Sequence, residues 1–261
     1  MVEVVRYGRQ LAGRLGIESS KPKEFEIVRD GKSWVKYPKG MNLEQFAQDI
    51  SRLDLVVSDL DDTIVPSPGL EIAVEIGKAD PFNPNYIRWA AYSTGQVIFN
   101  KDEAVSNSWR YLAENLGDHL IFQRSVNSWT EDKVRQKSHK GVLEVTQSLP
   151  QNAQSLLISR NDPRILASFA KVFRYDGFYG YEFEKRVPMG KFLDENPSIH
   201  KVLIIGDSKE DAEMVELSRE KGRKALSVCV CPNEGKPGFT ADVYASVKNQ
   251  KLLAKMMEGK L

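Results

Sequence analysis

The chain has 261 residues, 41% of them hydrophobic and 28% charged, a composition typical of a globular protein with one large or two small domains. Its formal net charge of +1 gives no indication of a polyanionic partner, so we expect no nucleic acid ligand. No apolar run approaches the roughly 20 residues that span a bilayer, and the N-terminus lacks a signal-peptide pattern, so we expect no membrane partner.

The first part of the chain, residues 1–52, is predicted to be an accessory segment. Its runs 25–29 and 32–37 are rich in β-forming residues and flank an Asp-Gly dipeptide, which favours a two-residue hairpin turn. Asn42 is a candidate N-cap for the short helix that follows. The sequence leaves the role of this segment open.

A short apolar run at 54–58, rich in β-branched residues, predicts a buried strand. Asp59, Asp61 and Asp62 follow it directly, and a loop rich in Pro and Gly begins at Pro66. Carboxylates at the end of a buried strand are costly unless a charged partner lies beside them. In an open α/β sheet the carboxyl ends of strands are the usual position of a ligand site. We therefore expect these acids to form part of one.

Between residues 66 and 150, apolar residues recur at helical spacing, which predicts a helical module. Its last helix is expected to run from Thr130 toward Leu149, and Pro150 closes the module. The basic run 133–140 is interpreted as a solvated helix face. Aromatic residues at helical spacing are mostly core residues, and a minority are candidates for lining a pocket. In this module they are Tyr86, Trp89, Tyr92, Trp109 and Trp129.

The rest of the chain alternates strand and helix patterns. Apolar runs at 156–158, 202–206 and 226–230 predict buried strands, and helical patterns follow the first two. The final segment, 249–258, is also helical in pattern. This alternation predicts an α/β fold whose core is a Rossmann-like, doubly wound parallel sheet. The predicted domains are the N-terminal accessory segment (1–52), the core (53–65 and 151–261) and the inserted helical module (66–150).

Polar side chains follow three of the predicted strands. Asp59 and Asp61 come after the first strand and Ser159 after the second. Asp207 and Asp211 come after the third. Because the carboxyl ends of parallel strands meet at one edge of the sheet, these groups are expected to share a crevice. Carboxylates a few ångströms apart repel unless a cation lies among them, and hard oxygen ligands suit Mg²⁺. The sequence therefore predicts a magnesium site.

The only cysteines, Cys229 and Cys231, lie two residues apart in an apolar run. On a strand they would share one face about 6–7 Å apart along the chain, which is a poor geometry for a disulfide. Two thiols are also too few for a zinc site, which needs about four ligands. Buried free thiols indicate a reducing, cytoplasmic setting.

The order and spacing of these motifs resemble the haloacid dehalogenase-like (HAD) hydrolase superfamily. Its first motif, Asp-x-Asp-x-Thr after an apolar strand, is matched by 59–63, and its second, a strand ending in Ser or Thr, by 156–159. Its fourth, Gly-Asp followed by a further acid, is matched by 206–211. Its third is a lysine before the fourth; Lys191 fits best, and Lys185 is the alternative.

The resemblance implies catalysis through an aspartyl-phosphate. Asp59 would be the nucleophile, and Asp61 would protonate the leaving alkoxide and then deprotonate the attacking water. Thr63 would fix the loop, and Asp62 would be only a neighbour. Haloalkanoate dehalogenases of this superfamily lack the second acid, so the presence of Asp61 favours phosphoryl transfer over cleavage of a carbon–halogen bond.

The resemblance also implies the remaining contacts. Ser159 would hydrogen-bond the phosphoryl oxygens and Lys191 would offset negative charge. Arg160 and Asn161 are further candidates for phosphate contact, with surface packing or helix capping as the alternative for each. Asp211 would contact the metal or orient a residue that does. The predicted metal ligands, three carboxylates and one main-chain carbonyl, come from Asp59, Asp61, Asp207 and Asp211.

The spacing of the motifs locates the insertion. There are 95 residues between Thr63 and Ser159 but only 31 between Ser159 and Lys191, which in this superfamily implies a type 1 cap and leaves no room for a type 2 cap. A cap closes over small substrates, so we expect a Mg²⁺-dependent phosphatase acting on a small phosphorylated metabolite. A phosphotransferase or phosphomutase, and a non-catalytic HAD-like binding protein, remain alternatives. The oligomeric state is left open.

Overall fold

The structure, a computed structural model, describes residues 24–99, 110–182, 184–232 and 237–261, with the backbone alone for 92–99. The predictions for residues 1–23, for the side chain of Tyr92 and for Trp109 lie outside the described residues. The strands are β1 (Phe25–Asp30), β2 (Ser33–Pro38), β3 (Leu55–Ser58), β4 (Gln154–Ile158), β5 (Gly177–Tyr179), β6 (Lys201–Gly206), β7 (Lys224–Cys231) and β8 (Val243–Ser246). The helices are α1 (Leu43–Ser51), α2 (Pro68–Ala79), α3 (Pro84–Phe99), α5 (Leu120–Asn127), α6 (Glu131–Lys137), α7 (Val142–Gln147), α8 (Pro163–Phe173), α9 (Arg186–Glu195), α10 (Lys209–Glu220) and α11 (Lys251–Met257).

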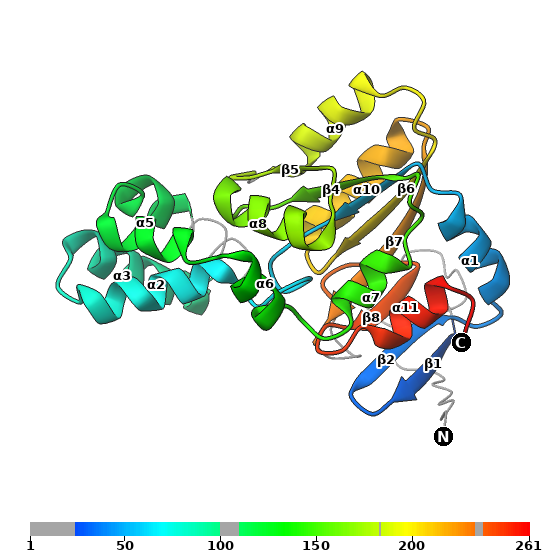
Figure 1. Ribbon diagram of the computed structural model, residues 1–261, viewed down its shortest axis with the longest axis horizontal. Helices are drawn as coiled ribbons and strands as arrows, with labels where there is room; N and C mark the ends of the chain where they lie inside the picture. Colours follow the sequence, from blue (N-terminus) through cyan, green and yellow to red (C-terminus); the bar gives the residue numbers. More distant parts are fainter. Residues whose placement is uncertain (1–23, 100–109, 183, 233–236) are drawn as a thin grey trace.

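The described strands form one eight-stranded sheet in the order β1-β2-β8-β7-β6-β3-β4-β5 (Figure 1). From β8 to β5 all neighbouring strands are parallel, and the chain winds outward from β3 in both directions. This confirms the predicted doubly wound α/β core. The crevice at the reversal point therefore lies beyond the carboxyl end of β3, where the acids follow.

The predicted hairpin is confirmed, and it belongs to the central sheet. Gly31 adopts a φ of +61° in the turn between β1 and β2, a conformation that glycine reaches without a Cβ penalty. β2 then pairs antiparallel with β8. The next helix, α1, begins as expected, because the Asn42 side chain accepts a hydrogen bond of 3.0 Å from the backbone N–H of Gln45.

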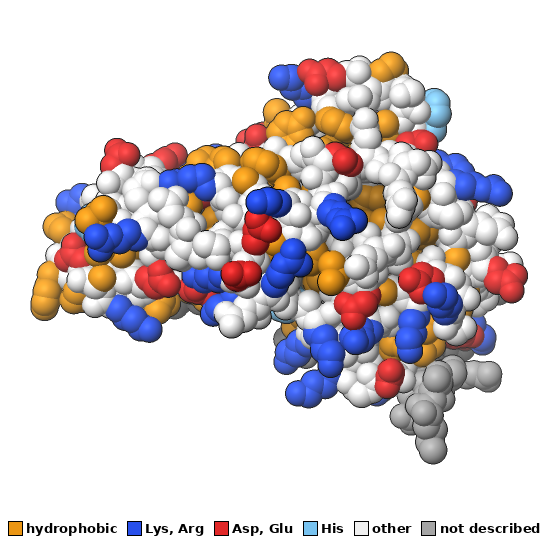
Figure 2. All heavy atoms as spheres, in the orientation of Figure 1, with side chains coloured by type: hydrophobic (Ala, Val, Ile, Leu, Met, Phe, Trp, Pro, Cys, Tyr) orange, Lys and Arg blue, Asp and Glu red, His pale blue; other side chains and the backbone are white. Residues whose placement is uncertain are grey.

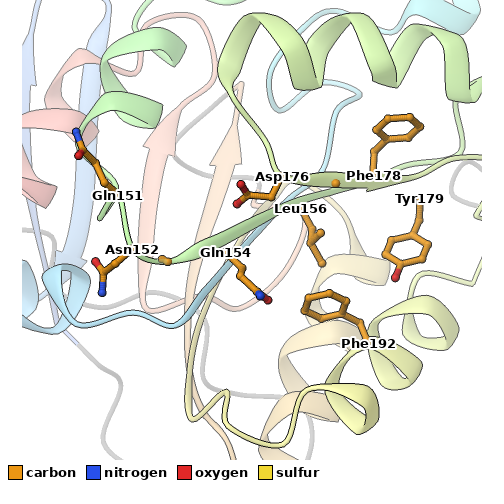
Figure 3. A pocket seen from close by; sticks show the side chains of 10 residues that line it. Gln151, Asn152, Gln154, Leu156, Asp176, Phe178, Tyr179 and Phe192 are labelled. Carbon is orange, nitrogen blue, oxygen red and sulfur yellow. The ribbon is translucent and has the colours of Figure 1, made fainter.

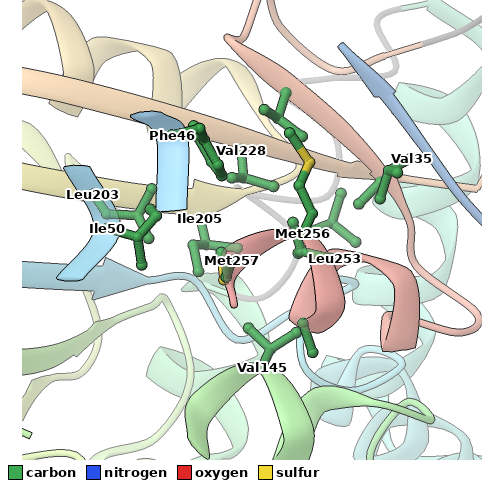
Figure 4. Packing of buried hydrophobic residues seen from close by; sticks show 14 of the residues in the cluster. Val35, Phe46, Ile50, Val145, Leu203, Ile205, Val228, Leu253, Met256 and Met257 are labelled. Atoms are coloured by element: carbon green, nitrogen blue, oxygen red, sulfur yellow. The ribbon is translucent and has the colours of Figure 1, made fainter. Parts of the chain in front are cut away.

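The two faces of the sheet are covered by different helices, since successive strand residues point to opposite sides. Val56 packs on the face covered by α1, α7 and α11 (Figure 4). Its neighbours Leu55 and Val57 pack on the other face, against α9 and α10. All three are at most 1% exposed, so the continuous apolar run of β3 reflects burial on both faces.

The insertion between β3 and β4 contains helices α2, α3, α5, α6 and α7. Helices α2, α3 and α5 project from the core (Figure 1). Helices α6 and α7, which lead the chain back to β4, lie against the core: α6 packs on α8, and α7 packs on α11. The prediction of a single helix from Thr130 toward Leu149 is wrong. Two helices, α6 and α7, are separated by a turn that ends at Gly141, whose φ is +89°. A Cβ at Gly141 would lie 2.5 Å from the backbone nitrogen of Lys251, so this crossing requires glycine.

Sequence patterns missed three elements of the core, namely β5, β8 and α9. β5 has three residues and β8 four, which is too short for a clear apolar period. α9 contains a proline and a glycine, the two residue types that most disfavour a helix. Cys229 and Cys231 are free thiols, 0% and 1% exposed. Among the described residues, no helix is long and apolar enough to cross a bilayer.

Candidate active site

The loop after β3 is a tight turn that carries the acids. The backbone N–H of Asp59 donates to Ile205 O at 2.9 Å, which fixes the start of the loop against β6. The carbonyl of Leu60 then accepts from three backbone N–H groups, those of residues 63, 64 and 65. Asp62 adopts a φ of +50°, is exposed and is not one of the three clustered acids. That Asp62 is only a neighbour of the reacting acids stays a prediction.

The structure brings three of the predicted metal ligands together. One carboxylate oxygen each from Asp59, Asp207 and Asp211 lies within 4.8 Å of the others. Gly206 allows this approach, because a Cβ there would lie 2.2 Å from the Asp211 carboxylate. The Asp61 side chain is not part of this cluster; the metal contact expected from Asp61 was its main-chain carbonyl.

Asp211 also organises the loop that carries Asp207. Its Oδ2 accepts from the backbone N–H groups of Asp207 and Ser208, both at 3.0 Å, and from the Ser208 hydroxyl at 2.7 Å. This is a capping box at the start of α10, with Ser208 as the N-cap. Because both of its oxygens accept hydrogen bonds from the protein, Asp211 orients the neighbouring groups of the cluster.

A buried lysine completes the cluster, and it is Lys185. Its Nζ lies 2.8 Å from Asp59 Oδ1 and 2.8 Å from Asp211 Oδ1, and its side chain is 2% exposed. The placement expected for Lys191 is wrong: Lys191 lies on the outer face of α9, 74% exposed, with Glu195 Oε1 at 3.9 Å. The lysine beside the acids is therefore Lys185, which the sequence offered as the alternative.

The physical reason lies in α9, which the sequence analysis did not identify. The helix buries Pro188, Met189 and Leu193 against the sheet, which turns Lys191 outward. Lys185 is the residue before the first turn of α9, close to the edge of the sheet. The apolar positions of α9 are the signal in the sequence that could have separated the two lysines. They predict that Lys191, inside the helix, faces water, and that Lys185, just before the helix, is free to face the site.

The second cluster surrounds the Asp61 carboxylate. Its Oδ2 accepts hydrogen bonds from the Ser159 hydroxyl, at 3.3 Å, and from the Asn161 side-chain amide. Ser159 and Asn161 are 0% and 1% exposed, and they are linked to each other through the Ser159 oxygen at 3.2 Å. Asp61 Oδ1 is buried and has no hydrogen-bond partner among the described residues. The two oxygens of Asp61 thus differ, since Oδ2 accepts from Ser159 and Asn161 and Oδ1 does not.

The remaining candidates lie at the border of the site. The Arg160 guanidinium forms an ion pair of 2.8 Å with Glu210 at the start of α10, so it bridges the ends of two core elements. Helix α8 is capped by Asp162 and not by Asn161, since the Asp162 carboxylate accepts from the backbone N–H of Arg164 at 2.9 Å. The Thr63 hydroxyl is buried and makes no hydrogen bond among the described residues, so Thr63 does not fix the loop through its side chain.

Burial and mutual repulsion raise the pKa values of the acids. Burial raises the pKa of Asp59 to about 7; Lys185 opposes the shift, and Asp211 and Asp61 add to it. Burial, with the charges of Asp59 and Asp211, raises the pKa of Asp207 to about 10. Burial alone would lower the pKa of Lys185, but the carboxylates of Asp211 and Asp59 hold it above its usual value.

Burial also raises the pKa of Asp61, although Ser67 and the cations Lys185 and Arg160 act in the opposite direction. A raised pKa favours the protonated form of a carboxyl, which is the form that acts as a general acid. The site thus contains two kinds of acid. Asp59 is paired with a lysine, whereas Asp61 is held by neutral donors.

The donor set fits a hard divalent cation. Carboxylate oxygens of Asp59, Asp207 and Asp211 lie within 4.8 Å of one another, and among the described residues Lys185 is the cation paired with Asp59 and Asp211. A divalent cation would offset the remaining repulsion. Mg²⁺ prefers oxygen ligands and retains several waters, so two carboxylates and a carbonyl suffice to hold it.

Mg²⁺ is expected to raise the melting temperature, and to raise it more as the pH increases from about 5 to about 8. The pKa values of Asp59 and Asp207 lie above those of free aspartate, so the metal-free folded protein retains protons that the unfolded chain has released. Its stability therefore falls as the pH rises from about 4, through about 7 for the contribution of Asp59 and through about 10 for that of Asp207. Mg²⁺ replaces these protons; at about 100 times its Kd it adds about 2.7 kcal/mol, a shift on the order of 5 °C. Melting curves with and without Mg²⁺ measure this, and an equal shift at both pH values would contradict it.

Two pockets differ in their relation to the acids. One of about 620 Å³ lies at the amino ends of β4 and β5, the opposite edge from the carboxylates, and contains no predicted site residue (Figure 3). The other, of about 370 Å³, lies between the insertion and the loop after β5. That loop is joined to the site, because Tyr181 N–H donates to Asn161 O at 3.0 Å. The second pocket is lined by Arg110, Ala113, Glu114, Gly117, Asp118, Phe122, Gln123 and Tyr181.

The other sequence candidates have structural positions. Trp129 is 2% exposed and packs on Phe169, with ring centroids 5.8 Å apart, so it is a core residue. The rings of Tyr86 and Trp89 contact each other with centroids 5.4 Å apart, and both side chains are partly buried against the apolar cluster that contains α2 and α5. In the basic run, Lys133 and Lys137 both pair with Glu71. Over α6, α7 and α11, basic and acidic side chains are interspersed, as expected of a solvated face (Figure 2).

Comparisons by sequence found nothing: no model of a known protein family matches the chain, and no curated protein matches it. Solved structures do match. A protein described as a haloacid dehalogenase-like hydrolase from Burkholderia xenovorans is 14% identical with a TM-score of 0.52, over 78% of this chain and 98% of that one. A substrate-bound phosphoserine phosphatase is 12% identical with a TM-score of 0.51, over 78% and 98%. DsGPDH of Dunaliella salina is 15% identical with a TM-score of 0.50, over 70% and 33%. At such identities these likenesses establish a shared fold.

Proposed function

We propose that this chain, which has the haloacid dehalogenase-like fold, is a Mg²⁺-dependent phosphatase that hydrolyses a small phosphorylated metabolite through an aspartyl-phosphate. The observation that carries the proposal is the separation of two acids at the end of β3. Asp59 lies among carboxylates beside Lys185, whereas Asp61 is held apart by Ser159 and Asn161. A nucleophile and a proton donor need these different surroundings.

The reaction balances with these two residues. In the first step Asp59 attacks phosphorus; the bond from its carboxylate oxygen to phosphorus forms as the ester P–O bond breaks, and the Asp61 proton passes to the leaving alkoxide. In the second step Asp61 takes a proton from water, the water oxygen bonds to phosphorus and the bond from Asp59 breaks. Inorganic phosphate leaves, and both carboxyl groups return to their starting states.

The neighbouring groups support these steps. Lys185 offsets charge on Asp59 and on the phosphoryl group, and its contact with Asp211 fixes its position. Ser159 and Asn161 orient Asp61 and would donate to the phosphoryl oxygens when the substrate is present. Asp59, Asp207 and the Asp61 carbonyl would hold Mg²⁺, which when bound supplies positive charge to the nucleophile and phosphate.

The pocket between the insertion and the loop after β5 supports a small substrate. Its volume of about 370 Å³ suits a small molecule, and its lining includes the charged side chains of Arg110, Glu114 and Asp118. These groups would contact the part of the substrate that leaves as an alcohol. A folded phosphoprotein would not enter such a space, so the proposal specifies a small phosphate ester.

The test is release of phosphate from a panel of small phosphate esters with and without Mg²⁺. We expect turnover that requires Mg²⁺, a preference within the panel, and a labelled phosphoryl group trapped on the peptide that contains Asp59. Release of chloride from 2-chloropropionate in place of phosphate would overturn the assignment in favour of dehalogenation. Transfer of the phosphoryl group to an added alcohol in preference to water would replace hydrolysis by phosphotransfer.

A further inference from the structure

The turn that carries Asp61 exposes two carbonyls to distant parts of the chain. Gln250, at the start of α11, donates from its side-chain amide Nε2 to Thr63 O at 2.6 Å. The backbone N–H of His139 donates to Ile64 O at 2.8 Å. Gln250 is 3% exposed, so its amide is a buried donor facing a buried loop. None of the strand-end motifs includes either residue.

These two donors form one unit. The backbone N–H of Gln250 donates to Lys140 O at 2.8 Å, and Lys140 pairs with Asn249 as an isolated bridge. The close approach at Gly141 holds the two segments together, since any side chain there would collide with Gln250. The segment returning from the insertion and the start of α11 therefore clamp the turn jointly.

The N-terminal hairpin supports this clamp from the other side. The Ser33 hydroxyl, 1% exposed, donates to Asn249 O at 2.7 Å and accepts from the backbone N–H of Leu252 at 3.2 Å. Gln250 is therefore fixed on both sides by hydrogen bonds from residues at its flanks. A side chain held in this way can set the position of the peptide groups it contacts.

We propose that Gln250 is a positioning residue that holds the Asp61 carboxyl in place for proton transfer, through its hydrogen bond to the carbonyl of Thr63. Asp61 and Val65 pair across the turn, and Thr63 lies between them, so a shift of the Thr63 peptide group moves Asp61. A change at Gln250 should therefore affect proton transfer by Asp61 and not the attack by Asp59, because Asp59 is anchored separately to β6. The inference rests on the proposed phosphatase function.

The test compares two substrates that differ in their need for a proton. 4-Nitrophenyl phosphate releases a stable phenolate, whereas phenyl phosphate releases a more basic one that gains more from protonation. Gln250→Met keeps the length of the side chain and removes the donor. We expect kcat/KM, which reports the first chemical step, to fall by about tenfold to a hundredfold for phenyl phosphate and much less for 4-nitrophenyl phosphate. Hydrolysis of the aspartyl-phosphate also uses Asp61, so that step should slow equally for both esters. Equal losses of kcat/KM on both esters, or no loss, would overturn the proposal.

Two controls separate positioning from general destabilisation. Ser33→Ala loosens the start of α11 that holds Gln250 but keeps the Gln250 amide, so it should lower the melting temperature and give a smaller difference between the esters than Gln250→Met. In an Asp61→Asn background, Gln250→Met should add no further difference between them, since the group that it positions is gone. An additional difference in that background would assign the effect to another residue.

A second measurement does not depend on turnover. Gln250→Met should increase amide hydrogen exchange in the peptide that covers residues 60–65, and Ser33→Ala should increase it less, because the Gln250 donor is kept. If the unmodified protein hydrolyses neither ester, the proposed function fails while this measurement still tests the clamp. Unchanged exchange in Gln250→Met would overturn the clamp even in an active phosphatase.

Discussion

Asp59→Asn is expected to lower kcat for phosphate release by at least about 10⁴-fold while the protein remains folded. An amide oxygen is a poor nucleophile, so no phosphoryl group should be trapped on the protein. Its shape still allows an amide oxygen to accept from Lys185, which keeps the arrangement of the buried cluster. Phosphate release and the labelled intermediate measure the loss, and circular dichroism checks the fold.

Asp62→Asn is the matched control for this variant. It makes the same chemical change three residues along the same turn, but Asp62 is exposed and lies outside the acidic cluster. Its φ of +50° is a conformation that asparagine adopts readily, so the turn is preserved. We expect kcat within about twofold of the unmodified protein, well inside the about 1.4 kcal/mol that a tenfold change represents. Comparable losses in both variants would contradict the assignment of Asp59.

Lys185→Met is expected to lower kcat by about 10²–10³-fold, the range for loss of one preorganised donor at a developing charge. The variant also leaves Asp59 and Asp211 buried without their cation. Removing one partner of a buried pair costs about 3–5 kcal/mol, so the melting temperature should fall in the absence of Mg²⁺ and recover in part when it is added. Activity should therefore be measured with Mg²⁺ present, below the melting transition.

Lys191→Met tests the lysine that fitted the sequence motif best. Its side chain is 74% exposed, with Glu195 Oε1 at 3.9 Å, so we expect no measurable change in kcat or melting temperature. The comparison is direct, since both variants replace a lysine by a methionine within six positions of each other. A large loss in Lys191→Met with none in Lys185→Met would assign the charge-offsetting role to Lys191 instead.

The sequence predicted the acidic half of the site because its signal is local. Asp59, Asp61 and Asp207 each follow an apolar run directly, and the register of a parallel sheet brings strand ends together. Lys185 lacked such a signal. Its position depends on which face of α9 is buried, and that is decided by packing against β4, β6 and α10.

Long-range contacts account for what else the sequence did not predict. Nothing near Gln250 indicates that its amide meets the turn after β3, 187 positions earlier in the chain. The break at Gly141 likewise depends on the path of α11 across it. Local patterns specify which segments become helices and strands, whereas the contacts between these segments depend on the assembled fold.

The pairing of β2 with β8 also affects the solubility of the sheet. Without the hairpin, β8 would end the sheet with four consecutive buried residues and a row of unpaired backbone groups, the kind of edge that adds strands from other molecules. The hairpin moves that edge outward to β1, which carries Glu26, Arg29 and Asp30. Charged side chains on an edge strand discourage further pairing. The hairpin therefore protects the core from aggregation, and a fragment that begins at β3 would lose this protection.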